Sequence, residues 1–316
     1  MPRVVALAGG VGGAKLAHGL AAILPAGDLT VVVNTGDDEE FHGLLVCPDH
    51  DTVLYTLAGL ADRERGWGLA GETWAAAETL ERLGEPTWFR LGDHDLALHV
   101  HRTRRLREGA RLTAVSRDIQ RALGVATPIL PMADQPVRTR VRTPDGWLPF
   151  QEYFVRLRQA PEVLEVAFAG IEAARPTPEV IDAIEAAEAM VLCPSNPFVS
   201  IGPILAVPGM RDLLDAARGR GVRVAAVSPL VGGRALRGPA DRMAASLGGE
   251  ASATGIARLY AGLVDALLIH DVDAAEAPAI ASLGIEPVVG PTIMGDDASR
   301  ASLAAAAVAA AWREGS

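Results

Sequence analysis

The feature that most constrains the fold is the N-terminal run from Val4 to Lys15, VVALAGGVGGAK. It predicts a buried β-strand, a glycine loop and the first turn of a helix that continues to Ile23. In such a turn the backbone N–H groups and the positive end of the helix point toward one place, and glycines allow a phosphate to come close. The run therefore indicates an α/β fold with a phosphate site at its first turn.

This glycine loop matches neither of the two familiar phosphate-binding motifs. A Walker loop needs Ser or Thr after its lysine, but Lys15 is followed by Leu16. A dinucleotide fingerprint needs a third glycine at the position of Lys15. A tight turn that binds no ligand is the alternative, and the cation of Lys15 favours an anion site instead. The candidate phosphate-binding residues are Gly10, Gly12, Gly13 and Lys15.

Composition limits the possible partners. The 316 residues are 49% hydrophobic, enough for a substantial core. A net charge of −10 argues against a general nucleic-acid or anionic-membrane surface, so a phosphorylated ligand requires a local basic site. No signal peptide and no apolar run of membrane-spanning length is visible in the sequence. We therefore expect a soluble, cytoplasmic protein.

Acidic residues cluster after the next predicted elements. Asp37 and Asp38 follow a β-branched strand that begins at Leu29, and Asp49 and Asp51 precede an apolar helix. In open α/β sheets, ligand residues gather beyond the carboxyl ends of the strands. Capping of the helix is the alternative role for Asp49 or Asp51. Clustered carboxylates beside a phosphate indicate a divalent cation.

In the middle of the chain, the alternation of predicted strands and helices is interrupted. A polar helical pattern is followed by two partly alternating runs, Val137–Thr143 and Trp147–Val155, joined by Pro-Asp-Gly. This spacing predicts a β-hairpin. We expect residues 63–165 to form an inserted helical and hairpin subdomain that covers the active-site cleft, within one α/β domain over residues 1–316.

Two later apolar runs, Ala189–Cys193 and Val222–Val227, end in loops rich in serine, proline and glycine. Hydroxyl, amide and guanidinium groups in such loops bind phosphate or ribose, although capping of the next helix is the alternative. The candidates for nucleotide binding are Ser195, Asn196, Ser228, Gly232 and Arg237. The complete pattern predicts a Rossmann-like, mostly parallel sheet sandwiched by helices, with the inserted subdomain.

Taken together, the motifs resemble the 2-phospho-L-lactate transferase family (CofD/FbiA) of coenzyme F420 biosynthesis. The motifs that carry this resemblance occur in family order between residues 7 and 243: LAGGVGGAKL, VVNTGDD, HGLLVCPDHDTVLYTLAG, RGWGLAGETW, LGDHDLALH, ILPMADQPV, FQEYFV, PSNPFVSIGPIL and SPLVGGRALRGPADRM. One departure is His94, which stands where the family pattern LGDRD has arginine.

The resemblance implies a transferase that acts on a deazaflavin. The donor would be a guanosine diphosphate that carries a lactyl or enolpyruvyl group, and the acceptor the ribityl hydroxyl of the deazaflavin Fo. GMP would leave, and F420-0 or dehydro-F420-0 would form. The resemblance also implies Mg²⁺ as cofactor and a homodimer. It does not indicate which three-carbon acid the donor carries.

The resemblance also assigns roles to individual residues. Asp37 and Asp51 match the acidic metal-site positions and are the expected catalytic residues. The positions around Fo are Asp51, Asp93, Asp95, Met132 and Asp134. The alternative function is that of the related gluconeogenesis-factor (YvcK-like) proteins, which bind nucleotide sugars as regulators without transferase activity. The motif CPDHDT and the later FQEYFV favour the transferase.

Overall fold

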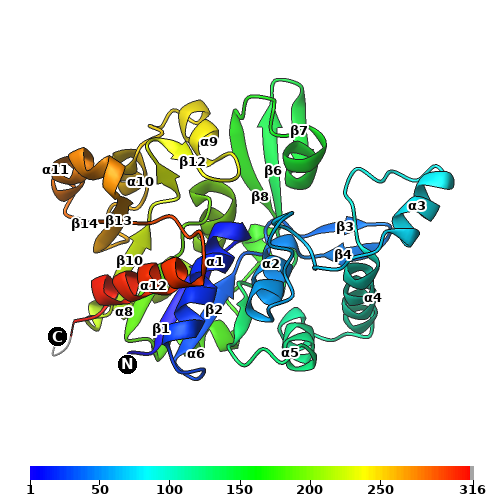
Figure 1. Ribbon diagram of the computed structural model, residues 1–316, viewed down its shortest axis with the longest axis horizontal. Helices are drawn as coiled ribbons and strands as arrows, with labels where there is room; N and C mark the ends of the chain where they lie inside the picture. Colours follow the sequence, from blue (N-terminus) through cyan, green and yellow to red (C-terminus); the bar gives the residue numbers. More distant parts are fainter. Residues whose placement is uncertain (314–316) are drawn as a thin grey trace.

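A seven-stranded parallel sheet forms the centre of the structure, a computed structural model that describes residues 1–313 (Figure 1). In spatial order its strands are β14 (Glu286–Gly290), β13 (Ala266–His270), β10 (Arg223–Val227), β9 (Ala189–Leu192), β1 (Val4–Ala8), β2 (Leu29–Val33) and β5 (Ile129–Pro131). The chain order reverses between β1 and β9. The predicted Rossmann-like sheet is confirmed, and such a reversal is where ligands bind in open α/β sheets.

The central strand β1 is buried on both faces because every residue in it is apolar. Successive side chains of a strand point to opposite faces. Accordingly, Val5 and Leu7 join one hydrophobic core, and Val4, Ala6 and Ala8 join another. A strand of this kind requires a helical layer on each side.

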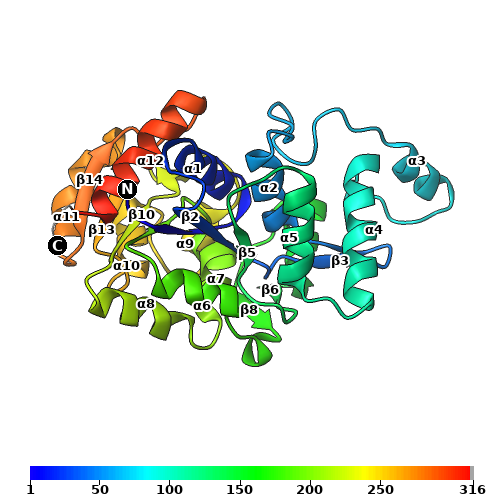
Figure 2. The ribbon, with the colours of Figure 1, turned by 90° about the horizontal axis from the view of Figure 1, so that it is seen from below.

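Helices supply those two layers (Figure 2). One face carries α1 (Gly10–Ile23), α2 (Pro48–Leu57), α5 (Leu112–Ala122) and α12 (Asp297–Ala311). The other carries α6 (Pro178–Glu185), α7 (Gly202–Ala206), α8 (Met210–Gly219), α9 (Ala240–Ser246), α10 (Ala253–Leu259) and α11 (Ala277–Ala281). None of the helices within residues 1–313 has the length and apolar character that crossing a bilayer requires.

The segment between β2 and β5 projects to one side of the sheet (Figures 1 and 2). It contains β3 (Glu39–Phe41), β4 (Leu44–Val46), α3 (Ala75–Arg82) and α4 (Asp93–Arg107). The backbone N–H of Leu45 donates to the Thr103 hydroxyl at 2.8 Å, which fastens α4 to the β3–β4 hairpin.

A second small sheet follows β5. It is antiparallel and consists of β6 (Arg138–Thr143), β7 (Gly146–Pro149) and β8 (Glu165–Ala169), in the order β7-β6-β8. The predicted hairpin is confirmed, but its second strand ends at Pro149, where the chain enters the π-helical turn η1 (Glu152–Arg156). The remaining short elements are η2 (Ile171–Ala173), η3 (Pro197–Ile201), β11 (Leu230–Val231), β12 (Arg234–Ala235) and η4 (Asp271–Glu276).

The predicted subdomain of residues 63–165 does not form one continuous insertion. Within it, β5 pairs with β2 and is the edge strand of the main sheet, because its residues Ile129 and Leu130 are apolar and pack in the two cores. The chain therefore leaves the sheet after β2, returns once, and leaves it again for the antiparallel sheet. The limits of the subdomain stay a prediction.

Candidate active site

Four loops converge where the strand order reverses, beyond the carboxyl ends of β1, β2, β9 and β10. The Ser195 hydroxyl after β9 donates to the Gly9 carbonyl at 2.8 Å and accepts from the Gly9 N–H at 3.0 Å. The Asn34 amide after β2 donates to Asp49 at 2.9 Å and to the Val199 carbonyl at 3.1 Å. Segments far apart in sequence thus form one polar floor.

Glycines in the first loop allow close packing of that loop against its neighbours. A Cβ atom on Gly12 would lie 2.4 Å from the Pro194 carbonyl oxygen, and one on Gly13 would lie 2.6 Å from the Ser195 hydroxyl. Gly10 adopts a φ of +64°, which favours glycine. The predicted glycine loop is therefore the contact between the first turn of α1 and the loop after β9.

Lys15 stands between two adjacent cavities. Its ammonium donates to the Met294 carbonyl at 3.1 Å. Burial lowers the pKa of Lys15, and the charges of Arg300 and Arg237 lower it further, so several cations share this region. Lys15 and Arg237 line both cavities, which have volumes of about 150 and 220 Å³.

We call the first cavity the strand-end pocket, because it opens beyond β9 and β10. Its lining comprises Val11, Gly12, Lys15, Pro194, Asn196, Ser228, Pro229, Val231, Leu236, Arg237, Ala240, Thr292, Ile293 and Met294. Several of these side chains are apolar, with Asn196 and Ser228 at the loop ends and Lys15 and Arg237 on the wall. Such a mixture suits a flat, partly apolar ligand with an anionic end.

The predicted nucleotide residues also support the loops themselves. The side-chain amide oxygen of Asn196 accepts from the Phe198 N–H at 2.9 Å and caps η3, as the alternative role predicted. The Ser228 hydroxyl donates to the Leu230 carbonyl at 3.0 Å, and the Gly232 N–H donates to Asp273 at 3.0 Å. Of the predicted set, Asn196, Ser228 and Arg237 line the strand-end pocket, while Ser195 and Gly232 lie behind its surface.

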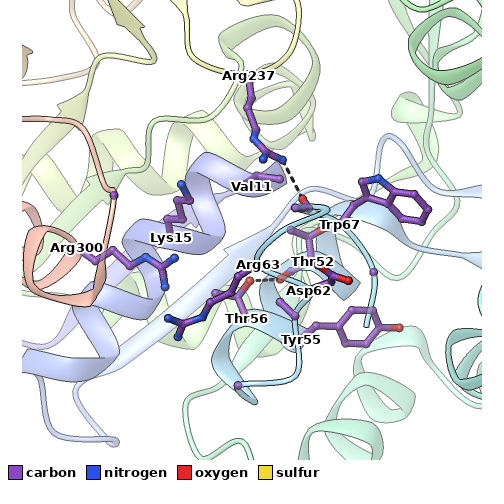
Figure 3. A pocket seen from close by; sticks show the side chains of 15 residues that line it. Val11, Lys15, Thr52, Tyr55, Thr56, Asp62, Arg63, Trp67, Arg237 and Arg300 are labelled. Atoms are coloured by element: carbon purple, nitrogen blue, oxygen red, sulfur yellow. Dashed lines mark hydrogen bonds between the residues drawn. The ribbon is translucent and has the colours of Figure 1, made fainter. Parts of the chain in front are cut away.

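We call the second cavity the arginine pocket (Figure 3). Its lining comprises Val11, Lys15, Thr52, Tyr55, Thr56, Gly59, Ala61, Asp62, Arg63, Gly66, Trp67, Gly68, Arg237, Gly295 and Arg300. Arg237 spans its mouth and donates to the Gly66 carbonyl at 3.2 Å. Gly66 permits this approach, because its φ is +77° and a Cβ atom there would overlap the Arg237 guanidinium.

Three buried carboxyl groups, Asp37, Asp38 and Asp49, lie near one another beyond β2 and at the start of α2. Burial raises the pKa of Asp37 well above its ordinary value, and the charges of Asp49 and Asp38 raise it further. Burial also raises the pKa of Asp49 to about 6 and that of Asp38 to about 7. One oxygen of Asp38 is buried without a hydrogen-bond partner. These carboxyl oxygens are ligands that a hard divalent cation prefers, and such a cation would neutralise the negative charge of the ionised groups.

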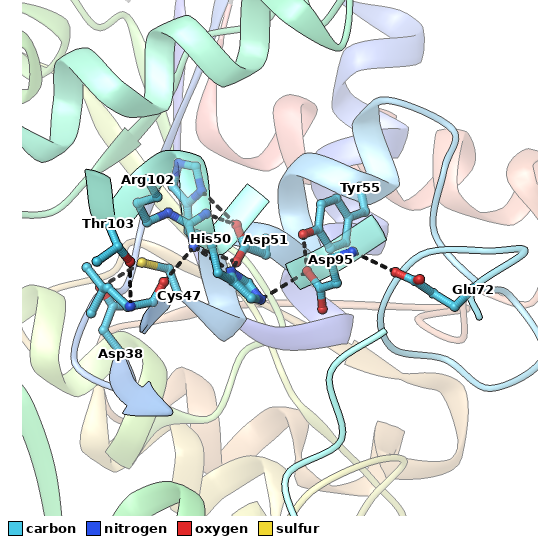
Figure 4. A network of polar contacts seen from close by, with 11 residues as sticks. Asp38, Cys47, His50, Asp51, Tyr55, Glu72, Asp95, Arg102 and Thr103 are labelled. Carbon is cyan, nitrogen blue, oxygen red and sulfur yellow. Dashed lines mark hydrogen bonds and ion pairs between the residues drawn. The ribbon is translucent and has the colours of Figure 1, made fainter. Parts of the chain in front are cut away.

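Asp51 lies in a different environment, a buried network with α4 (Figure 4). Both of its oxygens accept from the Arg102 guanidinium. Burial alone would raise the pKa of Asp51, but the charges of Arg102 and His99 and the hydrogen bonds from His50 and Arg102 together outweigh burial and hold this pKa well below the ordinary value. His99 lies 3.9 Å from Asp51 and 3.2 Å from Asp95, which also accepts from the Tyr55 hydroxyl.

The structure therefore places Asp37 and Asp51 in separate ligand sets. Within residues 1–313, the group of side chains spaced for a metal ion consists of Asp51, Asp95 and His99, and Asp37 is not part of it. Because Arg102 already neutralises Asp51, that group forms an ion-pair network. Asp49, treated in the sequence as a possible cap, lies beside Asp37 instead. The metal-binding roles of Asp37 and Asp51 stay predictions.

Three of the residues predicted around Fo have structural partners. Asp93 accepts from the Ala75 and Ala76 N–H groups at 3.1 and 3.0 Å and fixes the start of α3. Asp134 accepts from the Thr113 N–H at 2.8 Å and fixes the start of α5. Met132 is fully buried in the core. Their contacts with Fo stay predictions.

Sequence reasoning missed Arg63 and Arg300, which line the arginine pocket. In the sequence, Arg300 lies in the last predicted helix, and Arg63 lies in a charged segment of the kind that is usually exposed to solvent. No motif in the sequence contains both Arg63 and Arg300, so the sequence alone does not indicate that they lie close together.

Comparisons with known proteins relate this chain to one family of transferases. A sequence model of the family described as 2-phospho-L-lactate transferase CofD matches residues 4–286. A phosphoenolpyruvate transferase of Nocardia farcinica is 42% identical, over 96% of this chain and 92% of that protein. A 2-phospho-L-lactate transferase of Methanosarcina barkeri is 38% identical, over 92% of this chain and 93% of that protein.

Among solved structures, a UPF0052-family protein of Bacillus halodurans aligns with a TM-score of 0.62 over 96% of this chain and 98% of that one. At 16% sequence identity this likeness shows the shared α/β fold alone. The family match includes the glycine loop and the loops after β2, β9 and β10, and the two transferases align over more than nine tenths of this chain. The chain belongs to the CofD family of 2-phospho-L-lactate transferases.

Proposed function

We propose that this protein is the transferase of coenzyme F420 biosynthesis that moves a phospholactyl or phosphoenolpyruvyl group from a guanosine diphosphate donor to Fo. The observation that carries this proposal is the meeting of two cavities at Lys15 and Arg237, beside the glycine loop of a CofD-family chain. No observation favours a regulator that binds nucleotide sugars. We further expect a cytoplasmic homodimer.

The strand-end pocket suits the guanosine end of the donor. Its apolar wall can pack against a base, and Asn196 and Ser228 place polar atoms at its edge. The diphosphate would then lie at the first turn of α1, between Lys15 and Arg237, where cations and helix N–H groups favour negative charge. This arrangement leaves the arginine pocket for the group to be transferred.

Transfer requires in-line positioning and charge neutralisation more than a covalent nucleophile. The ribityl hydroxyl oxygen of Fo attacks the phosphorus distal to the guanosine, and the hydroxyl proton is released to solvent. The bond from this phosphorus to the bridging oxygen breaks, and GMP leaves with that electron pair. Lys15 and Arg237 remain in place as charge develops on the leaving phosphate.

Mg²⁺ is the cofactor that we propose, held by Asp37 with Asp49 beside it. The raised pKa values of both carboxyls mark a buried excess of negative charge that a divalent cation would remove. Such an ion supplies neutralisation of the phosphate oxygens when it is bound. Asp51 is less suited, because Arg102 already occupies both of its oxygens. We place Asp51 and Asp95 beside the acceptor instead.

The function is tested by incubating the purified protein with Mg²⁺, Fo and guanosine diphosphate donors that carry lactate, enolpyruvate or glycerate. We expect GMP and a single new deazaflavin product, whose mass identifies the acid. Binding of nucleotide sugars without binding of GDP or Fo would contradict the proposal.

A further inference from the structure

The arginine pocket holds more positive charge than a diphosphate requires. In addition to Lys15 and Arg237, which it shares with the strand-end pocket, it is lined by Arg63 and Arg300. Its acidic lining residue, Asp62, is paired with Arg65 at 2.9 Å, and Asp297 supplies one negative charge against the two positive charges of Arg63 and Arg300. In a protein with a net charge of −10, such a cluster indicates a ligand with a further anionic group.

Arg300 is the most informative of these side chains. It extends from α12 toward Lys15 and Arg63 (Figure 3) and is only 7% exposed. One guanidinium nitrogen donates to Asp297 at 3.0 Å, but Nε is buried and has no hydrogen-bond partner. Leaving a buried charged donor unpaired is costly, so an acceptor supplied by a ligand would stabilise this arrangement.

Asp297 holds the two arginines together. One of its oxygens accepts from Arg300, and the other lies 3.3 to 3.4 Å from two nitrogens of Arg63. The carboxylate thus orients both guanidinium groups from the solvent side. Paired planar guanidinium groups match the geometry of a carboxylate, to which each can donate two hydrogen bonds.

We propose that Arg300 and Arg63 bind the carboxylate of the three-carbon acid on the donor and so determine the specificity for an acidic group. The inference rests on the proposed function. The order of the cavities matches the order of groups along such a donor: nucleoside in the strand-end pocket, diphosphate at Lys15 and Arg237, and acid in the arginine pocket.

The test compares binding of GDP, the complete donor, and a donor analogue whose carboxylate is replaced by a carboxamide. Calorimetry would be done in Mg²⁺ on the wild type and on Arg63→Gln and Arg300→Lys. The wild type should bind the carboxylate donor about 10- to 100-fold more tightly than the carboxamide. Both variants should lose most of this preference and keep the wild-type affinity for GDP.

Arg258→Gln is the matched control, because Arg258 forms an exposed pair with Glu250 outside both pockets. It should retain the full preference. If Arg300→Lys fails to fold, Arg63→Gln decides the question, since that side chain is 63% exposed. Equal losses for GDP and donor, an unchanged preference, or a selective loss of Fo binding would each overturn the assignment. A wild type that binds no GDP and transfers nothing would overturn the proposed function itself.

Discussion

At the scale of single residues, neighbouring buried aspartates differ in what neutralises them. Asp51 has a fixed cation, Arg102, and its pKa lies below the ordinary value, whereas Asp37 and Asp49 have no such cation and their pKa values are raised. Sequence motifs present these aspartates as equivalent acidic positions. Their electrostatic environments show a structural ion pair for Asp51 and support the proposal of a cation site at Asp37 and Asp49.

The ion pair of Asp51 is expected to be essential for the fold. Arg102→Met would leave the Asp51 carboxylate buried without its cation, and the free energy of unfolding should fall by about 3 to 5 kcal/mol. Urea denaturation measures this loss. Arg104→Met is the control on the same helix, because its pair with Glu108 is exposed. Equal stability of the two variants would contradict the role of Arg102.

The carboxylate cluster predicts a stability that decreases with rising pH when metal is removed. Asp49 and Asp38 have folded-state pKa values of about 6 and about 7, above the ordinary aspartate value of 3.8. Between pH 3.8 and about 7 the folded state therefore holds protons that the unfolded state has released, and the free energy of unfolding falls as the pH rises through this window.

Asp49→Asn should reduce this loss of stability, because the variant has one fewer buried carboxyl group. In the presence of a chelator and at mildly alkaline pH, the variant should have a higher melting temperature than the wild type. The melting temperature of the variant should also decrease less steeply as the pH rises. Mg²⁺ should raise the melting temperature of the wild type more than that of the variant. Calorimetric scans across pH measure both effects, and a variant less stable than the metal-free wild type would argue against a repulsive cluster.

At the scale of elements, α1 and α12 are packed with almost no space between them. A Cβ atom on Gly19 of α1 would lie 2.2 Å from the backbone oxygen of Arg300. This contact between residues near opposite ends of the chain sets the position of the Arg300 side chain at the arginine pocket. Helix packing and the pocket are thus coupled.

Gly19→Ala should therefore disturb both stability and ligand binding. Because the opposing atom is backbone, α12 must shift, and overpacking of this kind costs about 1 to 3 kcal/mol. The affinity for the carboxylate donor should fall more than that for GDP. Gly219→Ala, at the end of α8, is the control because nothing lies within 4 Å of its added Cβ atom. Equal melting temperatures for the two variants would refute the close contact.

Local patterns predicted the elements better than their contacts. The run from Val4 to Ile23 gave β1 and α1 correctly, because burial on both faces and helical periodicity are local properties. The pairing of β8 with β6 depends on tertiary contacts that periodicity does not encode. The proximity of Arg300 to Lys15 likewise follows from helix packing, which no local pattern encodes.

At the scale of the whole molecule, the site joins segments that are distant in the chain. The strand-end pocket takes Lys15 from α1, Ser228 from the loop after β10, and Met294 from the loop before α12. The cleft therefore borders segments from several parts of the chain. A ligand that fills the cleft contacts all of these segments at once, so binding should stabilise the entire fold and not one loop.

GDP with Mg²⁺ is therefore expected to raise the free energy of global unfolding by about 2.7 kcal/mol at a ligand concentration of about one hundred times Kd. Arg237→Gln should need a higher GDP concentration for the same shift in melting temperature, because Arg237 lines both pockets, whereas Arg258→Gln should behave as the wild type. Hydrogen exchange read at β1, β9 and β10 distinguishes global from local stabilisation. Protection confined to the glycine loop, with no change at these strands, would show that the ligand orders a single loop and does not hold the two halves of the sheet together.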